Sequence, residues 1–133
     1  MTRGDRKLVL NVLEESLSIV RLSPDERLPE WIDGDSWCSV TRTPDELSVV
    51  CASWLVPSGV QCTGPWRAMQ VAGPLDFALT GILSRIADPL AHAKISIFAV
   101  STYDTDYVLV REQDVGQAAA CLKSAGIVVR APN

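Results

Sequence analysis

The sequence predicts an α+β protein in which antiparallel sheets carry helices on one face. The second half alternates between segments of strand and helix periodicity, whereas the first half has four strand-like segments and little helical pattern. Between the halves, residues 56–65 contain two prolines and two glycines, a composition typical of a boundary between units. We therefore expect an N-terminal unit at residues 1–64 and a C-terminal unit at residues 65–133.

Strands are expected to dominate the first half. A loop rich in proline and aspartate, residues 23–34, separates the first two strands from the next two. Thr43 and Pro44 would suit the start of a helix, but the residues that follow alternate as a strand does. We therefore interpret residues 43–46 as a tight turn. The expected strands are residues 8–13, 17–22, 37–41 and 47–54.

The second half has the order β-α-β-β-α-β. An apolar stripe predicts a first helix, which Asp88 and Pro89 are expected to kink or shorten near its end. Asp114 suits the N-cap of a second helix, and Gly126 suits its C-terminal end. Residues 95–100 are almost continuously apolar, which predicts a strand buried on both faces. The apolar stripe of the first helix consists of Leu79, Ile82, Leu83, Ile86 and Leu90. The inner face of the second helix consists of Val115, Ala118, Ala119, Leu122 and Ala125. The expected strands are residues 66–72, 95–100, 107–110 and 127–129.

This order is that of a ferredoxin-like unit, in which both helices cover one face of an antiparallel sheet. The opposite face and the sheet edges need a cover of their own. The strand-rich first half could supply it, and so could a second copy of the chain.

Composition and charge exclude several classes of partner. The chain has 133 residues and a net charge of −4, and its twelve Lys and Arg residues are scattered, which argues against nucleic acid. No apolar run approaches the roughly 20 residues that a membrane span needs. The charged N-terminus leads straight into a strand pattern without a signal-peptide cleavage site, so we expect a cytoplasmic protein.

The cysteines and the single histidine do not form a catalytic or metal-binding motif. Cys38, Cys51, Cys62 and Cys121 are too widely spaced for a C-x-x-C motif and are interpreted as reduced packing thiols. His92 has no metal ligand at suitable spacing and no triad partner. An acylphosphatase-type enzyme would need an arginine beside a glycine-rich phosphate loop, which the sequence lacks. We expect no enzyme, no metal and no cofactor.

The most polar segment between apolar strands is residues 101–107. In one interpretation it is a hairpin connection whose Ser, Thr and Asp side chains bond their own backbone. In the other, the hydroxyls of Thr102 and Thr105 and the carboxylate of Asp106 face a ligand, and Asp106 suits an ammonium group. The helix start at residues 78–81 could then hold a carboxylate, so the two groups together would suit a free α-amino acid.

Residues 73–77, 81–83 and 95–114 carry a family resemblance. They resemble the ACT domains related to those of aspartokinases, above all in the string Ser-Thr-Tyr-x-Thr-Asp-Tyr-x-Leu-Val at residues 101–110. Residues 39–47 fit the same family, so the resemblance covers nearly the whole chain. The chain is similar to short bacterial tandem-ACT proteins and to the halves of the eukaryotic cytosolic arginine sensors.

The resemblance implies two ferredoxin-like, ACT-type units and an amino acid bound where two ACT domains meet, here in a homodimer. Ser96 and Ile97 would come from one ACT unit, and Thr102, Tyr103 and Asp106 from its partner. The helix start would contribute Leu79, Thr80 and Gly81.

Leu79 stands where the resemblance leads us to expect an acidic residue for a guanidinium group. A buried guanidinium without a carboxylate is costly, so a smaller or apolar amino acid suits the site at least as well as arginine. The expected function is a regulatory amino-acid sensor that acts through a partner protein. The main alternative is a structural or interaction module that has kept the fold and binds no ligand.

Overall fold

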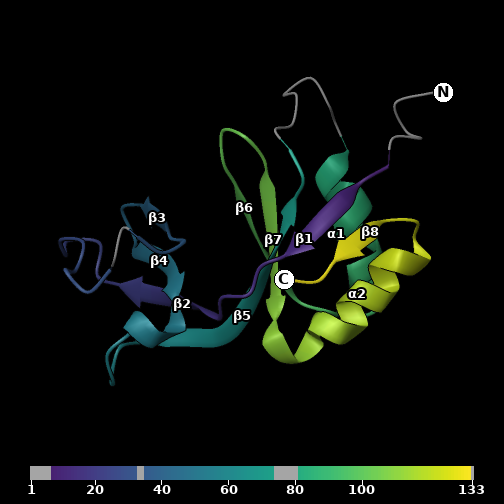
Figure 1. Ribbon diagram of the computed structural model, residues 1–133. Coiled ribbons are helices and arrows are strands. Elements are labelled where there is room, and N and C mark those ends of the chain that lie inside the picture. Colours follow the sequence, from purple (N-terminus) through teal and green to yellow (C-terminus); the bar gives the residue numbers. More distant parts are fainter. Residues whose placement is uncertain (1–6, 33–34, 74–80, 133) are drawn as a thin grey trace. The chain divides into compact units, whose positions relative to one another are not determined.

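A computed structural model describes residues 7–32, 35–73 and 81–132 of the chain (Figure 1). It confirms the predicted α+β class and divides into two compact units. The strand unit is Glu15–Trp66, and the helical unit combines Met1–Glu14 with Arg67–Asn133. This division differs from the expected 1–64 and 65–133 in the first strand, which belongs with the second half of the chain because its hydrogen-bonded neighbours lie there.

The helical unit contains a five-stranded sheet in the order β6-β7-β5-β1-β8. β1 runs antiparallel to β5 and parallel to β8, and β6 runs antiparallel to β7. From β5 onward the elements follow the predicted β-α-β-β-α-β order, and β1 is inserted between β5 and β8. The elements are β1 (Val9–Val12), β5 (Cys62–Val71, of which the last part lies in this unit), α1 (Ile82–His92), β6 (Ile97–Ser101), β7 (Asp106–Arg111), a 3-10 turn (Glu112–Asp114), α2 (Val115–Ser124) and β8 (Val128–Arg130).

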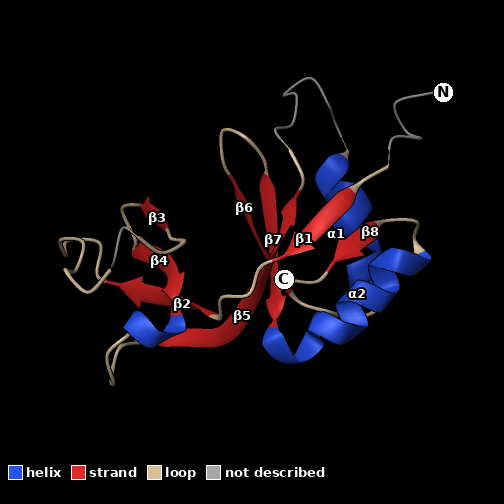
Figure 2. Cartoon of the chain, viewed as in Figure 1, coloured by secondary structure: helices blue, strands red, loops and turns tan. Residues whose placement is uncertain are grey.

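Both helices of the helical unit pack on the same face of its sheet (Figure 2). Alternate residues of β1 point to this face, and Ile86 and Leu90 of α1 meet them with no exposed surface. Within the described residues, neither helix has the length and apolar composition that crossing a bilayer requires. The buried core consists of Leu8, Leu10, Val12, Met69, Val71, Ile86, Leu90, Ile95, Val108, Val110, Ala118, Leu122 and Ile127.

One expectation about the helices was wrong, and one is confirmed. Pro89 lies inside α1 near its end, where buried Leu90 packs in the core, and α1 ends at His92. Asp114 occupies the N-cap position of α2 without a side-chain capping bond, since the 3-10 turn leads directly into the helix. Gly126 ends α2 as predicted, with φ of 86° and a backbone bond to Lys123.

The prediction that residues 95–100 form a strand buried on both faces was wrong. Among the described strands β6 pairs with β7 alone, so it is an edge strand. Phe98 and Val100 are half-buried and Ala99 is exposed. The apolar composition of β6 therefore reflects an uncovered edge rather than a position inside the sheet.

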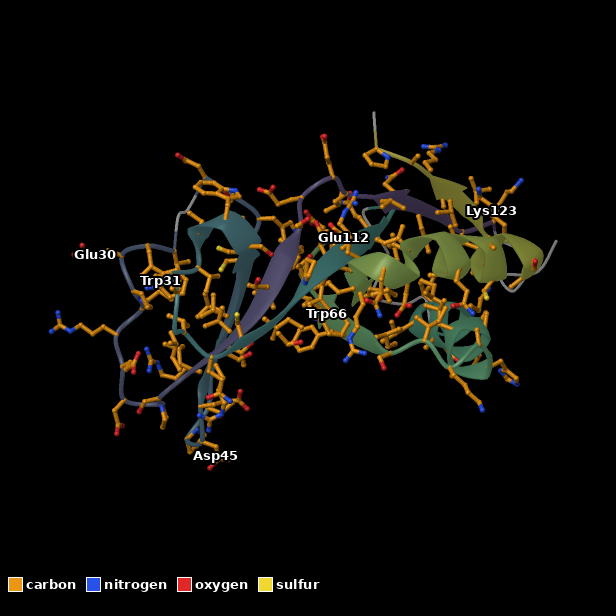
Figure 3. All side chains as sticks on the ribbon, turned by 90° about the horizontal axis from the view of Figure 1, so that it is seen from below. Glu30, Trp31, Asp45, Trp66, Glu112 and Lys123 are labelled. Carbon is orange, nitrogen blue, oxygen red and sulfur yellow. The ribbon has the colours of Figure 1, made fainter. Side chains whose placement is uncertain are left out.

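The strand unit is a four-stranded antiparallel sheet in the order β3-β4-β2-β5. Residues 43–46 form the predicted turn, in which the Thr43 hydroxyl accepts hydrogen bonds from the backbone of Asp45 and Glu46. Trp31 and Ile32, from the connection after β2, pack on the small core of this unit (Figure 3). The elements are β2 (Leu17–Leu22), β3 (Ser39–Arg42), β4 (Leu47–Ala52), a 3-10 turn (Ser53–Leu55) and the first part of β5, and the core consists of Val20, Leu47, Val49 and Cys51.

β5 begins four residues earlier than the predicted strand at 66–72, at Cys62. Gly64 and Pro65 lie where the pairing of β5 with β2 shifts by one residue, an irregularity that accommodates both residue types within a strand. A Cβ atom on Gly64 would lie 2.9 Å from the backbone oxygen of Leu17. The close approach of β2 therefore requires glycine at this position.

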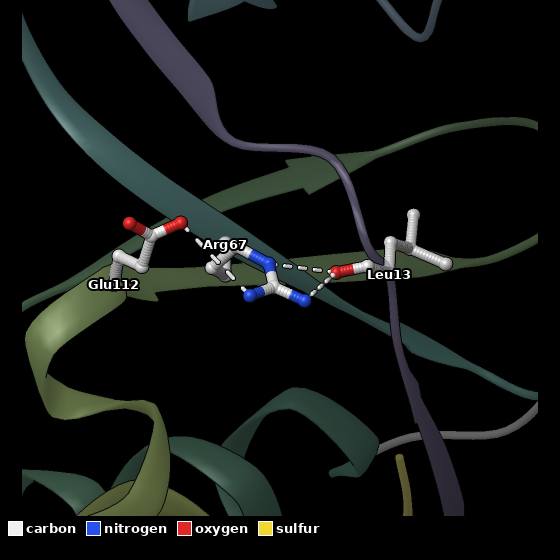
Figure 4. Close-up of polar contacts among 3 residues, drawn as sticks. All are labelled: Leu13, Arg67 and Glu112. Atoms are coloured by element: carbon white, nitrogen blue, oxygen red, sulfur yellow. Dashed lines mark hydrogen bonds and ion pairs between the residues drawn. The ribbon is translucent and has the colours of Figure 1, made fainter. Parts of the chain in front are cut away.

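The Arg67 side chain joins three elements of the helical unit (Figure 4). Its Nε and Nη2 atoms donate to the Leu13 carbonyl at 2.8 and 2.7 Å, just after β1. Its Nη1 atom lies 3.9 Å from a carboxylate oxygen of Glu112, which follows β7. Because the Glu112 side chain is 40% exposed, the ion pair adds little, and the two bonds to Leu13 are the stronger link.

We predict that Gly64→Ala lowers the free energy of unfolding by about 1–3 kcal/mol, because the added methyl group collides with the backbone of β2. Urea denaturation would measure the change. Gly116→Ala is the matched control, since a Cβ atom at this α2 position meets nothing within 4 Å. The control should be neutral or stabilising by up to about 1 kcal/mol, and equal effects of both substitutions would contradict the prediction.

Candidate functional site

The tip of the β6–β7 hairpin is closed by Thr102. Its backbone N–H donates to the Thr105 carbonyl at 2.8 Å, and its hydroxyl donates to the same carbonyl at 3.1 Å. The Thr105 backbone N–H in turn donates to the Thr102 hydroxyl at 3.3 Å. The Thr102 side chain thus bonds its own hairpin, as the hairpin interpretation of the sequence anticipated.

Thr105 fastens the hairpin to the central strand of the helical unit. Its side chain is buried, with 5% of the residue exposed, and its hydroxyl donates to the Val71 carbonyl at 2.6 Å. Val71 is the last residue of β5. The sequence had suggested Thr105 as a ligand-facing hydroxyl, but the structure gives it the role of holding the hairpin against the end of β5.

Asp106 lies opposite Ser101 in the β6–β7 ladder. The Ser101 hydroxyl donates to the Asp106 carboxylate at 2.6 Å, and Asp106 is half-buried. Tyr103, at the tip, is 83% exposed. This end of the hairpin therefore carries an oriented carboxylate and an exposed aromatic ring, and groups of both kinds can bind a cation.

The structure places the beginning of α1 at the same end of the helical unit as the hairpin tip (Figure 1). Gly81 precedes α1 with φ of 76°, a left-handed conformation that favours glycine. It is exposed, so its surroundings leave room for a close approach. Leu79 and Thr80, the other two predicted residues of the helix start, lie outside the described residues.

Ser96 and Ile97 lie at the other end of β6. Ser96 is exposed and directly precedes the strand, and Ile97 is its first residue. At about 3.3 Å per residue, Ser96 and Thr102 are roughly 20 Å apart along β6. A single chain therefore brings Thr102, Tyr103 and Asp106 together and leaves Ser96 and Ile97 apart from them.

Two residues of this region were not among the predicted site residues. Ser101 orients the Asp106 carboxylate, and its place opposite Asp106 follows from the length of the hairpin loop. Gln70 donates to the hydroxyl of Tyr107 at 3.2 Å, next to Asp106 on β7. The sequence carries no local signal for that contact because the two residues are far apart in the chain. Among the described residues, no three His, Cys, Asp or Glu side chains are grouped so that they could hold a metal ion.

Comparisons with known proteins identify the family. A family model described as an ACT domain matches residues 61–124, and a second model, described as an N-terminal domain, matches residues 15–59. Protein Atu0741 from Agrobacterium tumefaciens is 39% identical, has a TM-score of 0.89 and shares 96% of both chains. The chain is an ACT-type protein. It belongs to the same family as the Agrobacterium protein, and the family-model match confirms the ACT resemblance.

Two more distant relatives match the chain in different ways, one over a short stretch of sequence and the other in its fold. The human protein named cytosolic arginine sensor for mTORC1 subunit 1 is 41% identical over 59 residues, which is 44% of this chain and 18% of the sensor. The matched stretch thus spans less than a fifth of that relative's length. A structure of aspartokinase alpha and beta subunits has a TM-score of 0.64 at 14% identity, covering 90% of this chain and 98% of that one, and so shares the fold.

We predict that Thr105→Val destabilises the ACT-type chain by about 1–3 kcal/mol, because it leaves the Val71 carbonyl without its buried donor. Asp106→Ala should cost less than about 1 kcal/mol, since its bond with Ser101 is solvent-exposed. Urea denaturation of both variants tests the contrast. A loss of several kcal/mol in Asp106→Ala would show instead that Asp106 is a structural residue.

Proposed function

We propose that this ACT-type chain is a non-catalytic regulatory protein that binds a free amino acid between two copies of itself. The observation that carries the proposal is the placement of the predicted site residues at opposite ends of β6. If all of them contact one ligand, a second chain must bring the missing end. The proposal includes a cytoplasmic location, which the name of the human sensor supports.

The edge of β6 is suited to pairing with a second copy. Residues 97–101 contain no charged residue and no proline, and their pairing with β7 has no bulge. Charged residues, prolines and bulges normally protect a sheet edge from pairing with other chains, and β6 lacks all three. The opposite edge of this sheet, β8, has three residues and ends with Arg130. The edge strand of the strand unit, β3, ends with Arg42 and is mostly exposed.

Symmetry determines the register of such a pair. Two copies related by a two-fold axis pair antiparallel, and Ala99 is the middle residue of β6. If the axis passes at Ala99, Ser96 of each copy lies opposite Thr102 of the other. Ile97 then lies opposite Ser101. This register brings together Ser96 and Ile97 of one copy with Thr102, Tyr103 and Asp106 of the other, twice per dimer.

An amino acid fits the chemistry of this shared site. In the proposal the Asp106 carboxylate accepts hydrogen bonds from the ammonium group, and the helix start that the sequence predicts at Leu79, Thr80 and Gly81 donates to the carboxylate. Leu79 favours a neutral or apolar side chain over arginine because a buried guanidinium would lack a counter-charge. The amino-acid-sensing name of the human relative supports this class of ligand.

The tandem arrangement belongs to the same proposal. The strand unit, predicted as an ACT-like unit at residues 1–64, has a four-stranded antiparallel sheet and no α-helix among its described residues. We take it as a reduced ACT-like unit that contacts a regulated partner protein when the amino acid is bound.

One observation favours a second candidate function, an interaction module without ligand. The hydroxyls of Thr102 and Thr105 are already engaged within the helical unit, so two of the polar groups at the hairpin tip have structural partners. In this alternative the dimer edge would remain and no amino acid would bind.

We predict that at least one neutral amino acid raises the melting temperature of the chain in a thermal-shift screen of the twenty amino acids, whereas arginine raises it less. A ligand that binds only the folded state stabilises it by mass action. Asp106→Ala should abolish the shift while leaving the melting temperature without ligand nearly unchanged. Ser84→Ala, on the exposed face of α1, is the control and should keep the shift. No shift with any amino acid would favour the interaction module, and tight arginine binding would refute the role given to Leu79.

We predict that the chain is a dimer at micromolar concentration and that Ala99→Lys makes it a monomer, measured by sedimentation. At the axis the two lysines would face each other, and directly opposed like charges destabilise a strand pair. Ala99→Glu should also be monomeric, and an equimolar mixture of the two variants should form a dimer again. Dimers of either variant alone would place the interface elsewhere on the chain.

A further inference from the structure

Three of the four cysteines lie in the strand unit, and all of them are free thiols. Cys51, on β4, has no exposed surface, whereas Cys38 and Cys62 are exposed. The β3–β4 ladder ends with Ser39 opposite Val50. Cys38 directly precedes β3, and continuing the register by one residue would set it opposite Cys51. Because opposed residues of antiparallel strands point to the same face, the two thiols share one side of the sheet.

A second observation concerns the electrostatics of Cys51. Burial above all, and then the neighbouring thiol groups of Cys38 and Cys62, raise the pKa of Cys51 to about 11. Both exposed thiols therefore lie within electrostatic range of Cys51. The register decides between them, because it leads to Cys38 opposite Cys51 on the neighbouring strand, whereas Cys62 is two strands away.

We infer that Cys38 and Cys51 form an oxidisable dithiol site that closes to a disulfide when it meets a low-molecular-weight disulfide such as glutathione disulfide. Opposed residues of an antiparallel pair have Cα atoms about 4.5–5.5 Å apart, within the range of about 4.4–6.8 Å that disulfides span. The Cα separation typical of opposed residues is therefore compatible with a disulfide.

The other two pairings in the strand unit are too long for a disulfide. Cys38 and Cys62 lie at the two edges of the sheet, with β4 and β2 between them, which is roughly 14 Å at one strand spacing of about 4.8 Å. Cys62 pairs with Val20, which in turn pairs with Val49, so Cys62 is two strand spacings, roughly 10 Å, from Val49. Cys51 is two residues further along β4, so it lies beyond that distance. The site consists of Cys38 and Cys51 alone.

The reaction proceeds in two exchange steps. The Cys38 thiolate attacks one sulfur of glutathione disulfide, which forms a mixed disulfide and releases one glutathione thiolate. The Cys51 thiolate then attacks the Cys38 sulfur, the bond to the second glutathione breaks, and that glutathione leaves as a thiolate. Both leaving thiolates take up the protons given up by the two cysteines. Two protein thiols are oxidised, and one glutathione disulfide is reduced to two glutathiones.

The bond would tie the beginning of β3 to β4. Residues 23–38 connect β2 to β3 and carry Trp31 and Ile32, which pack on the core of the strand unit. A link at Cys38 would therefore fix the end of this connection as well as the edge strand. We expect the oxidised chain to melt several degrees higher than the reduced chain.

The test is to treat the full chain with glutathione disulfide, alkylate the remaining thiols and map the cysteines by mass spectrometry. Cys38 and Cys51 should be joined with the loss of two hydrogen atoms, whereas exposed Cys62 should carry one glutathione. The chain thus contains its own control, since Cys62 has no second thiol within reach. Closure should quicken as the pH rises from 7 to 9, because burial raises the pKa of Cys51 and its thiolate fraction grows with pH.

Two variants separate the proposal from unspecific oxidation. In Cys51→Ala the mixed disulfide at Cys38 should accumulate to the level seen at Cys62. The double variant Cys62→Ser, Cys121→Ser keeps the pair and should still lose both remaining thiols without forming a covalent dimer. Stable glutathione on Cys38 in the unaltered chain would overturn the proposal, and so would a bond from Cys51 to Cys62 or disulfide-linked dimers through Cys38.

Discussion

Strand β5 pairs with β2 over its first residues and with β1 over its last, and the neighbours of the other strands follow from this division. Gly64 permits the close approach of β2, and Arg67 joins the strand to the carbonyl of Leu13 where the second pairing begins. The end of the strand, at Val71, then receives the hydroxyl of Thr105. One strand thus sets the sheet of the strand unit, the sheet of the helical unit and the position of the hairpin tip.

Periodicity predicted most elements because the burial of alternate or helically spaced residues is a local property of the sequence. It predicted β1 as a strand but could not assign it to the helical unit, because its parallel pairing with β8 joins residues far apart in the chain. It also misread β6, since a continuous apolar run is common to strands inside a sheet and to edges that meet another chain. The Gly64–Pro65 pair looked like a loop for a similar reason, because a strand irregularity and a turn use the same residues.

The sequence predicted the hairpin between two apolar strands but not its hydrogen bonds. Tyr103 lies at the hairpin tip and Asp106 begins β7, and their role toward a ligand stays a prediction. The sequence left two roles open for Thr105, because a hydroxyl between strands can face outward or inward, and only the neighbouring β5 carbonyl decides between them. Hydrogen bonds of this kind join separate strands, so they appear only once the sheet is assembled.

The position of β6 has a thermodynamic consequence for the proposed sensor. A ligand that contacts Ser96 and Ile97 of one copy and Asp106 of the other binds the dimer and not the monomer. Mass action then requires that the ligand strengthen dimerisation, and that higher protein concentration strengthen the apparent affinity for the ligand, by the same coupling free energy. The hairpin tip takes part in this coupling through Thr105, which holds it on β5 before any ligand arrives. At protein concentrations low enough for monomers to be present, signalling in the proposed sensor would need no hinge, because the population of dimers itself would report the concentration of the amino acid.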